Sequence, residues 1–225
     1  MNPPFDPPSI LLHAPQLGEN IGSAARVMLN FGFTDLRLIC PRDGWPNPAA
    51  ETLSAGAFIS GLEVSVHETL ESAFAGLTYL VATTARIRGL EKQVLSTAQT
   101  ISTLSKRSQA GFGRSGLLFG SESSGLPNEV VAGVDHILTY PVSAGFSSLN
   151  LAMAVGVFCS AWAEQMGDFT PVSSEPAAKL ADQSPASRDD VLRLFQHFEE
   201  ELDAANYFYP PEKTPVMIQN LRAAL

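Results

Sequence analysis

One predicted helix carries the first residues that could do chemistry, in the stretch "ENIGSAARVMLNFGF" (residues 19–33). Its apolar residues recur with helical spacing and would pack on a sheet: Ile21, Ala24, Ala25, Met28 and Leu29. Ser23, Arg26 and Asn30 then point elsewhere. Arg26 lies in the first turns, where a cation opposes the helix macrodipole, so we expect an anionic or electron-rich group to meet its guanidinium. Asn20 stands at the expected N-cap, where its side chain would satisfy a backbone N–H and stabilise the helix by about 1 kcal/mol.

A second stretch places a carboxylate at the end of a predicted strand. In "LLFGSESSGLPNEV" (residues 117–130), an apolar strand runs into a glycine-rich turn that carries Glu122. The carboxyl ends of parallel strands are where ligands bind, and Gly120 permits a close approach of the backbone. Taken alone, the turn is better explained as a strand-to-helix connection in which Glu122 lies near a helix start and is favoured by the macrodipole.

A third stretch, "ILTYPVSAGFSSLNLAMAVGVF" (residues 137–158), combines a strand end near Tyr140 with a new helix that opens at "SSLN". Ser147 or Ser148 would be the N-cap of this helix. A capping serine leaves Asn150, inside the first turn, without a capping role. The free N–H groups and hydroxyls of this helix start would face the same end of the sheet as the Glu122 turn.

Several other chemistries are disfavoured. The segment "GFGRSG" (residues 111–116) fits the pattern G-x-G-x-x-G, but it precedes an apolar strand, whereas the dinucleotide-binding fingerprint follows a strand and opens a helix. The sequence contains no G-x-S-x-G segment, which disfavours a serine hydrolase. The two cysteines and four histidines lack the spacing of metal ligands, so we predict no metal.

Further elements must position these residues, and their pattern is typical of an α/β protein. Short apolar runs, which indicate buried parallel strands, occur at residues 9–14, 35–40, 62–67, 77–85, 116–121 and 136–142. A long helical run covers residues 147–166, and a linker rich in Pro, Ser and Ala follows at 167–187. Ser187 can cap a further helix, and a second short helix follows it. We therefore predict a domain at 1–166, the linker, and a short helical extension at 188–225.

The composition is that of a globular protein, with 45% hydrophobic and 16% charged residues and no apolar run long enough to cross a bilayer. The proline-rich N-terminus lacks a signal-peptide pattern, so we expect a cytoplasmic protein with no membrane partner. The net charge of −9 argues against nucleic acid as a partner. Residues 83–114, however, hold six basic residues against the single acid Glu91, and this local charge of +5 either steers RNA or forms an ordinary solvated face.

Together, the three stretches resemble the motifs of the SpoU branch of the SPOUT superclass, the RNA 2'-O-ribose methyltransferases that use S-adenosylmethionine. The resemblance rests on "NIGSAARVMLNFGF", "LLFGSESSGLPNEV" and "YPVSAGFSSLNLAMAV", in the order and spacing of that family's motifs, and it covers residues 9–166. The tail around "FEEELDAANYFYPPEK" further resembles TrmJ-type tRNA methyltransferases, which modify an anticodon-loop ribose. The resemblance implies a mostly parallel sheet with a C-terminal trefoil knot. It also implies S-adenosylmethionine as the cofactor and S-adenosylhomocysteine as its product.

The resemblance also assigns roles to individual residues. The catalytic positions are Asn20, Arg26, Glu122, Ser148 and Asn150. The cofactor pocket is assigned to Thr83, Thr84, Ala85, Gly120, Tyr140, Ser147, Ser148 and Leu149. Independently of the resemblance, the basic segment leads us to expect RNA binding at Arg86, Arg88 and Lys92.

The chemistry of the reaction constrains the role of Arg26. A ribose hydroxyl is a poor nucleophile, which must be polarised and held in line with the methyl group. Because a guanidinium stays protonated at neutral pH, we expect Arg26 to orient the nucleotide and stabilise the incipient alkoxide rather than to act as the base. Glu122, Ser148 and Asn150 would fix the substrate and the loops by hydrogen bonding.

The leading functional hypothesis is methylation of a tRNA ribose of the cytidine or uridine 32 type. An rRNA 2'-O-methyltransferase and a non-catalytic RNA-binding relative are the alternatives. The family further implies a homodimer with the site at the subunit interface. The apolar side of the last core helix, formed by Leu151, Val155, Phe158 and Trp162, is either that interface or part of the core. The family's tail normally continues past the position of Leu225 with a further basic helix.

Overall fold

The computed structural model describes residues 6–84, 92–143, 145–166 and 186–224. The chain divides into two compact units, Met1–Thr170 and Pro171–Leu225, and the boundary falls inside the segment that we predict as a linker. Ala85, Arg86 and Arg88 lie outside the described residues. Within the described ranges, no helix has the length and apolar character that a bilayer span requires.

The first unit is built on a seven-stranded sheet with the strand order β3-β2-β1-β6-β4-β7-β5. The strands are β1 Ser9–His13, β2 Asp35–Ile39, β3 Glu63–His67, β4 Leu77–Thr83, β5 Val94–Leu95, β6 Arg114–Phe119 and β7 His136–Leu138. All the pairings between these strands are parallel. The predicted fold class, an α/β protein with a mostly parallel sheet, is therefore confirmed, while the trefoil knot stays a prediction.

Alternate residues of the central strands face opposite sides of the sheet, and both sides are buried. On β1, Ile10 and Leu12 pack in one core cluster and Leu11 packs in the other. Likewise on β6, Leu117 faces the first cluster and Leu118 the second. Burial on both faces explains why these strands read as continuous apolar runs in the sequence.

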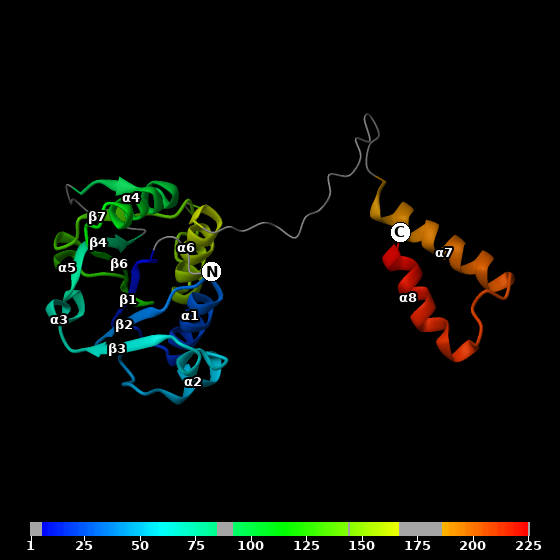
Figure 1. Ribbon diagram of the computed structural model, residues 1–225, viewed down its shortest axis with the longest axis horizontal. Coiled ribbons are helices and arrows are strands. Elements are labelled where there is room, and N and C mark those ends of the chain that lie inside the picture. Colours follow the sequence, from blue (N-terminus) through cyan, green and yellow to red (C-terminus); the bar gives the residue numbers. More distant parts are fainter. Residues whose placement is uncertain (1–5, 85–91, 144, 167–185, 225) are drawn as a thin grey trace. The chain divides into compact units, whose positions relative to one another are not determined.

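Helices cover both faces of the sheet. Their bounds are α1 Gly18–Asn30, α2 Pro48–Leu53, α3 Leu70–Phe74, α4 Thr97–Gln109, α5 Asn128–Ala132 and α6 Leu151–Met166, with a 3-10 turn η1 at Ala57–Ile59. The larger core cluster joins α1, α2, α4 and α6 to the sheet, and the other joins α3 and α5 to its opposite face. Figure 1 shows α1 and α6 side by side on one side of the sheet.

The structure decides the alternatives for the apolar side of α6. Leu151, Val155, Phe158 and Trp162 are all at most 4% exposed, and Phe33 makes edge-to-face ring contacts with two of them. This side of α6 is therefore core, and the prediction of an interface there is wrong. The exposed apolar residues of the helix are Met153 and Val157, on its other side.

Two helices and a strand were not resolved by the sequence pattern. β5 and α4 fall within the basic segment, and α5 lies in the stretch that we predict as a turn. Only Ile101 and Leu104 of α4 reach the core, so its apolar stripe is short. Its start is fixed by a capping box between Ser96 and Gln99, a local signal that was present in the sequence.

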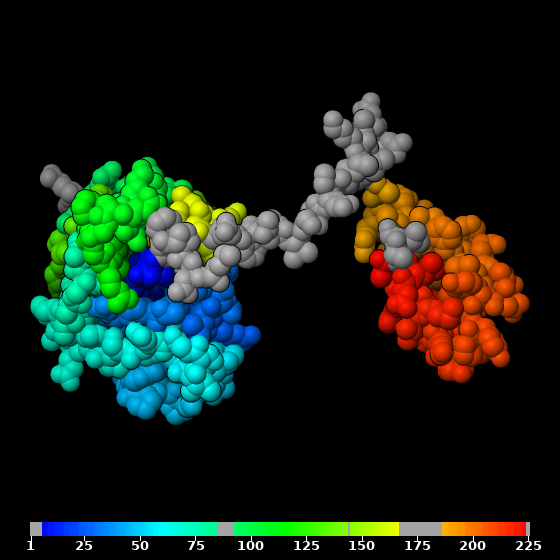
Figure 2. Space-filling view, in the orientation of Figure 1, coloured from blue at the N-terminus to red at the C-terminus, as the bar shows by residue number. Residues whose placement is uncertain are grey.

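The second unit is a hairpin of two helices. Its elements are α7 Arg188–Ala204, the 3-10 turn η2 Pro211–Lys213 and α8 Thr214–Ala224. As predicted, Ser187 caps α7, accepting from the Asp190 N–H at 3.2 Å. Figure 1 shows the two helices side by side within this unit. Arg222 of α8 donates to both carboxylate oxygens of Glu199 on α7, at 2.6 and 3.0 Å. Figure 2 shows the same unit in space-filling form. Phe195 is the one residue of α7 that is buried in this hairpin.

Candidate active site

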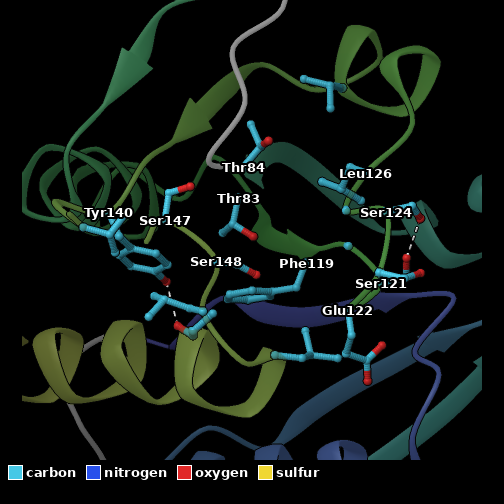
Figure 3. Close-up of a pocket in the computed structure, with 18 of the residues that line it drawn as sticks. Thr83, Thr84, Phe119, Ser121, Glu122, Ser124, Leu126, Tyr140, Ser147 and Ser148 are labelled. Carbon is cyan, nitrogen blue, oxygen red and sulfur yellow. Dashed lines mark hydrogen bonds between the residues drawn. The ribbon is translucent and has the colours of Figure 1, made fainter. Parts of the chain in front are cut away.

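A cavity of about 240 Å³ opens at the carboxyl edge of the sheet, where β4, β6 and β7 end. Because the strands are parallel, their ends share one edge and bring three distant loops together. Figure 3 shows side chains of the three loops around the same space. The lining includes all the predicted cofactor residues that the structure describes: Thr83, Thr84, Gly120, Tyr140, Ser147, Ser148 and Leu149. Ala85 follows directly but lies outside the described residues.

Gly120 allows the turn after β6 to fold back onto the strand end. A Cβ at this position would lie 2.3 Å from the carbonyl carbon of Gly125 and 2.4 Å from the nitrogen of Leu126. Gly125 has a φ of 70°, and an antiparallel bridge joins it to Ser121. Backbone, rather than side chains, therefore forms this wall of the cavity.

Two hydroxyl groups of the predicted cofactor residues are already used within the protein. Thr83 donates to the Leu118 carbonyl at 3.0 Å. Tyr140 donates to the Ala154 carbonyl at 2.7 Å, and this second bond is the one marked at Tyr140 in Figure 3. Burial raises the pKa of the Tyr140 phenol, so this hydroxyl stays a donor. These residues hold the loops to the strands and to α6, and they reach a ligand through their ring, methyl or backbone groups.

The serines of the third loop are in the opposite situation. Ser147 and Ser148 line the cavity, are exposed, and their hydroxyls make no hydrogen bond with any residue that the structure describes. In Figure 3, both lie at the rim of the space that Tyr140 and Phe119 border. They are therefore available to donate to a ligand and to accept from it.

Glu122 follows β6 in the sequence but contacts the start of α1. Its carboxylate accepts from the backbone N–H groups of Gln16 at 2.8 Å and Leu17 at 3.3 Å. It also accepts from the Asn20 Nδ2 at 2.7 Å, and the Asn20 Oδ1 accepts from the Asn150 Nδ2 at 2.8 Å. One residue from each of the three motifs thus joins a single series of hydrogen bonds, which we call the Glu122–Asn20–Asn150 chain.

The hydrogen bonds of the Glu122–Asn20–Asn150 chain show that two predictions about helix caps are wrong. Asn20 is not the N-cap of α1, which is Leu17; it is 7% exposed, and both ends of its amide are used in the chain. Conversely, Asn150 is the residue that caps α6, in place of the two predicted serines. Its Oδ1 accepts from the N–H groups of Ala152 at 2.9 Å and Met153 at 3.3 Å, so the helix begins at Leu151, two or three residues later than a serine cap predicts.

The electrostatics of Glu122 are those of a fixed anion. Burial opposes its ionisation, but the hydrogen bonds from Asn20, Gln16 and Leu17 outweigh burial and hold the pKa of the carboxyl below its ordinary value. A carboxylate whose pKa is lowered and whose oxygens are both occupied is a weak proton acceptor. Glu122 is therefore a poor general base for a hydroxyl group.

Arg26 is exposed and does not line the cavity. It follows Asn20 by six residues, which on an α-helix is about 9 Å along the axis and about 120° around it. No residue in the described part of the chain forms a hydrogen bond or ion pair with its guanidinium. Its neighbour Val27 lies 3.4 Å from the position of a Gly156 Cβ, so this part of α1 packs on α6. The loop before α6 and the helix itself expose an apolar strip, formed by Leu149 at 38%, Met153 at 63% and Val157 at 46%.

The predicted RNA-binding residues are described only in part. Lys92 is half-buried, and its Nζ donates to the Val134 carbonyl at 2.5 Å, while Arg86 and Arg88 lie outside the described residues. Their RNA-binding roles stay predictions. Among the residues with described positions, no cluster of three or more His, Cys, Asp or Glu is placed to hold a metal ion.

Some residues of the site were missed from the sequence. The remaining cavity wall includes Phe119, Ser121, Leu126 and Asn128, all within the second motif, and Val131 directly after it. Gln16 was missed as well, although its side chain also donates to the Ser123 hydroxyl at 2.7 Å. No pattern marks Gln16, because its contact to Glu122 uses a backbone N–H that every residue except proline carries.

The arrangement suits a ligand of nucleoside type. Leu126, Val131 and Leu149 offer apolar surface for a flat ring, and hydroxyl and amide groups around them offer hydrogen bonds. The described lining contains the carboxylate of Glu122 and no Lys or Arg, so a positively charged or neutral group of a ligand meets no like charge there. Such a site can bind and orient a ligand, and its own side chains include no activated nucleophile.

Comparison with known proteins agrees with these motifs. Residues 7–160 match the model of the SpoU rRNA Methylase family. The "Uncharacterized tRNA/rRNA methyltransferase LasT" of Escherichia coli (strain K12) is 35% identical over 151 residues, which are 67% of this chain and 65% of that protein. The TrmJ of Pseudomonas aeruginosa (strain UCBPP-PA14), a tRNA (cytidine/uridine/adenosine-2'-O-)-methyltransferase, is 30% identical over 207 residues, 90% of this chain and 79% of that protein. The alignment with the crystal structure of TrmJ from Z. mobilis ZM4 covers 96% of this chain and 88% of the TrmJ chain, with a TM-score of 0.66 and 39% sequence identity.

Proposed function

Because the chain belongs to the SpoU rRNA Methylase family, we propose that it transfers a methyl group from S-adenosylmethionine to a ribose 2'-hydroxyl in tRNA, at a position of the 32 type in the anticodon loop. The observation that carries the proposal is the meeting of three motif loops around one cavity at the strand ends. The tRNA substrate is supported by the likeness to proteins named as tRNA 2'-O-methyltransferases. The anticodon-loop position rests on the resemblance of the tail to TrmJ-type enzymes.

The residues of the cavity fit the methyl donor. S-adenosylmethionine supplies a methyl group on a positively charged sulfur, which an oxygen nucleophile can attack. Leu126, Val131 and Leu149 would pack on the adenine ring, and Ser147 and Ser148 would bind polar groups of the donor. Close approach at the Gly120 turn exposes backbone groups in the same wall, so binding would rely on main-chain contacts as well as on side chains.

Arg26 would act on the RNA rather than on the donor. Its guanidinium presents donors in a planar fork, which suits a phosphate and the developing alkoxide of the ribose. Electrostatic stabilisation of that charge lowers the barrier without any proton transfer to the arginine. In a single chain, however, Arg26 lies outside the cavity.

A second copy of the chain would complete the site. The strip of Leu149, Met153 and Val157 is open to solvent, and Leu149 also lines the cavity. Its helix α6 packs on α1 at Val27, the residue next to Arg26. Pairing two copies through this face of α1 and α6 would cover the strip and bring the Arg26 of one copy toward the cavity rim of the other. The protein would then be a homodimer with two shared sites.

Mixed dimers test this sharing. Two differently tagged copies are co-expressed, one carrying Arg26→Ala and the other Gly120→Ala, and dimers with both tags are purified. If Arg26 acts across the interface, each mixed dimer keeps one intact site and about half of the wild-type activity returns. If Arg26 serves its own chain, no site is intact, and activity as low as in either single variant would contradict the shared site.

The activity itself is tested in two steps. Calorimetry measures binding of S-adenosylmethionine, and incubation with unmodified bulk tRNA or with rRNA then measures methyl transfer. Donor binding followed by transfer to tRNA supports the proposal. Transfer to rRNA alone would contradict the tRNA substrate, and tight donor binding without any transfer would instead identify a non-catalytic relative.

A further inference from the structure

The Glu122–Asn20–Asn150 chain can form all its hydrogen bonds in one direction only. A carboxylate accepts but does not donate, so Asn20 must turn its Nδ2 toward Glu122 and its Oδ1 away from it. Asn150 must then offer its Nδ2 to Asn20, which leaves its Oδ1 for the N–H groups of α6. The negative charge at one end therefore dictates the orientation of both amides.

Both ends of the chain lie at helix starts. Glu122 receives the N–H groups that precede α1, and Asn150 caps α6 directly after the loop residues Ser147 to Leu149, which line the cavity. Asn20, in the middle, is 7% exposed, so water has little room to replace a lost partner. The chain thus ties the helix that carries Arg26 to two of the three loops around the cavity.

We propose that Glu122 is a positioning residue: through Asn20 and Asn150 it fixes the start of α6, and with it the Ser147–Leu149 wall that binds the methyl donor. The inference rests on the proposed function, because that function names the ligand for which the wall is positioned. The competing role, direct proton abstraction by Glu122, needs a free carboxylate oxygen. Here the two oxygens accept three hydrogen bonds.

Variants that reverse the donor and acceptor directions of these hydrogen bonds distinguish positioning by Glu122 from proton abstraction by Glu122. Glu122→Gln removes the charge and places an amide where donors converge, so the orientation of Asn20 is no longer fixed. Asn150→Asp still accepts the N–H groups of Ala152 and Met153 and so keeps the helix cap, but it cannot donate to Asn20. In the double variant both hydrogen bonds between the three side chains can form again in the opposite direction: Gln at 122 donates to Asn20, and Asn20 donates to Asp at 150. The long bond from the Leu17 N–H, which shares Oε1 with Asn20, is not restored.

The expected result is a rescue. Each single variant should bind S-adenosylhomocysteine at least about 10-fold more weakly than the wild type, and the double variant should return to within about threefold, a coupling of the size seen between groups in direct contact. A matched control pairs Glu122→Gln with Asn128→Asp. Asn128 lines the same cavity outside the chain, so this pair restores the net charge without restoring the hydrogen bonds, and it should show no rescue.

Three results would overturn the proposal. The first is wild-type affinity for S-adenosylhomocysteine in both single variants, and the second is an equal recovery of affinity in the control pair. The third is a double variant that folds normally but whose loss of affinity equals the product of the two single losses. Donor binding and thermal unfolding are both measured, so a loss of folding is distinguished from a loss of positioning. Failure of the wild type to bind or use the donor would contradict the proposed function. The difference between the double variant and the sum of the single variants in thermal unfolding would still show whether the Glu122–Asn20–Asn150 hydrogen bonds act together.

A second measurement needs no variant. In a pH titration of the wild type followed by NMR, the side-chain NH₂ signals of Asn20 and Asn150 should shift with one common midpoint, although only Asn20 contacts Glu122. The NH₂ signal of Asn47, whose side chain caps α2, serves as the control and should not share that midpoint. An Asn150 signal that ignores the protonation of Glu122 would contradict transmission along the chain.

Discussion

Replacing Gly120 with alanine should narrow the cavity from within. The added Cβ would lie 2.3 Å from the Gly125 carbonyl carbon and 2.4 Å from the Leu126 nitrogen, whereas ordinary contacts begin near 3.4 Å. The obstructing atoms are backbone, so the turn must retreat by about 1 Å, and overpacking of this kind costs about 1–3 kcal/mol. The turn forms one wall of the cavity, so we expect donor affinity to fall by roughly 10-fold to 100-fold.

The assay is calorimetric titration with S-adenosylhomocysteine, accompanied by thermal unfolding. Gly22→Ala is the matched control, because its Cβ would lie 2.2 Å from the Ala50 carbonyl oxygen, where α1 meets α2 away from the cavity. This control should unfold at a lower temperature yet bind the ligand normally while folded. Gly133→Ala, with its nearest neighbour at 3.5 Å, should change neither property. Unaltered ligand affinity in Gly120→Ala, or an equal loss of affinity in Gly22→Ala, would contradict the claim that the backbone at Gly120 forms a wall of the donor cavity.

Three further predictions follow from named contacts. Arg26→Lys should lower kcat by roughly 10-fold or more and leave donor affinity unchanged, because lysine keeps the charge but loses the planar fork; full turnover in a steady-state assay would rule out a bidentate role. The pKa of Glu122 lies below its ordinary value of 4.5, so its stabilising contribution is complete above that value and lost as the pH falls through the lower folded-state pKa; Glu122→Gln should remove this part of the pH dependence of thermal unfolding, and an unchanged profile would contradict it. Tyr140→Phe should lower the free energy of unfolding by about 1 kcal/mol in denaturant titrations, through loss of the hydrogen bond to Ala154, and no change would show that this bond contributes nothing.

The sequence predicted the fold where one pattern dominated. The buried face of α1, with Ile21, Ala24, Ala25 and Met28, is the one its helical spacing predicts. The six apolar runs correspond to strands. Burial on both faces makes β1, β4 and β6 continuously apolar, whereas β3, at the edge of the sheet, has no buried residue and alternates in sequence. β5 has only two residues and α4 a short stripe, so neither produced a pattern strong enough to separate it from the surrounding basic segment.

The sequence predicted which residues form the site, but not the hydrogen bonds between them. The strand ends gave the cavity residues, because a parallel sheet brings those ends to one edge. The caps were wrong for a physical reason: Asn20 and Asn150 stand 130 positions apart, and a hydrogen bond between them decides what each side chain does. Local capping rules describe a helix by itself and cannot include that contact.

The homodimer, the anticodon-loop substrate and the role of Arg26 depend on molecules beyond a single chain. Within the chain, the exposed strip of α6 and the isolated guanidinium lie on neighbouring helices, which is why the mixed-dimer experiment examines both together. The RNA-binding role of Lys92 is open to the same kind of test. Its ammonium is held by the Val134 carbonyl, so its substitution should affect stability as well as RNA affinity.

The most direct measurement of the central claim uses S-adenosylmethionine with a deuterated methyl group and an unmodified tRNA transcript. After incubation with the purified protein, the RNA is digested to nucleosides and to oligonucleotides, and both are analysed by mass spectrometry. We predict that the label lies on the ribose of one nucleotide in the anticodon loop, at the position of the 32 type, and is absent with Arg26→Ala. Label on a base, or no label despite bound donor, would contradict ribose 2'-O-methylation.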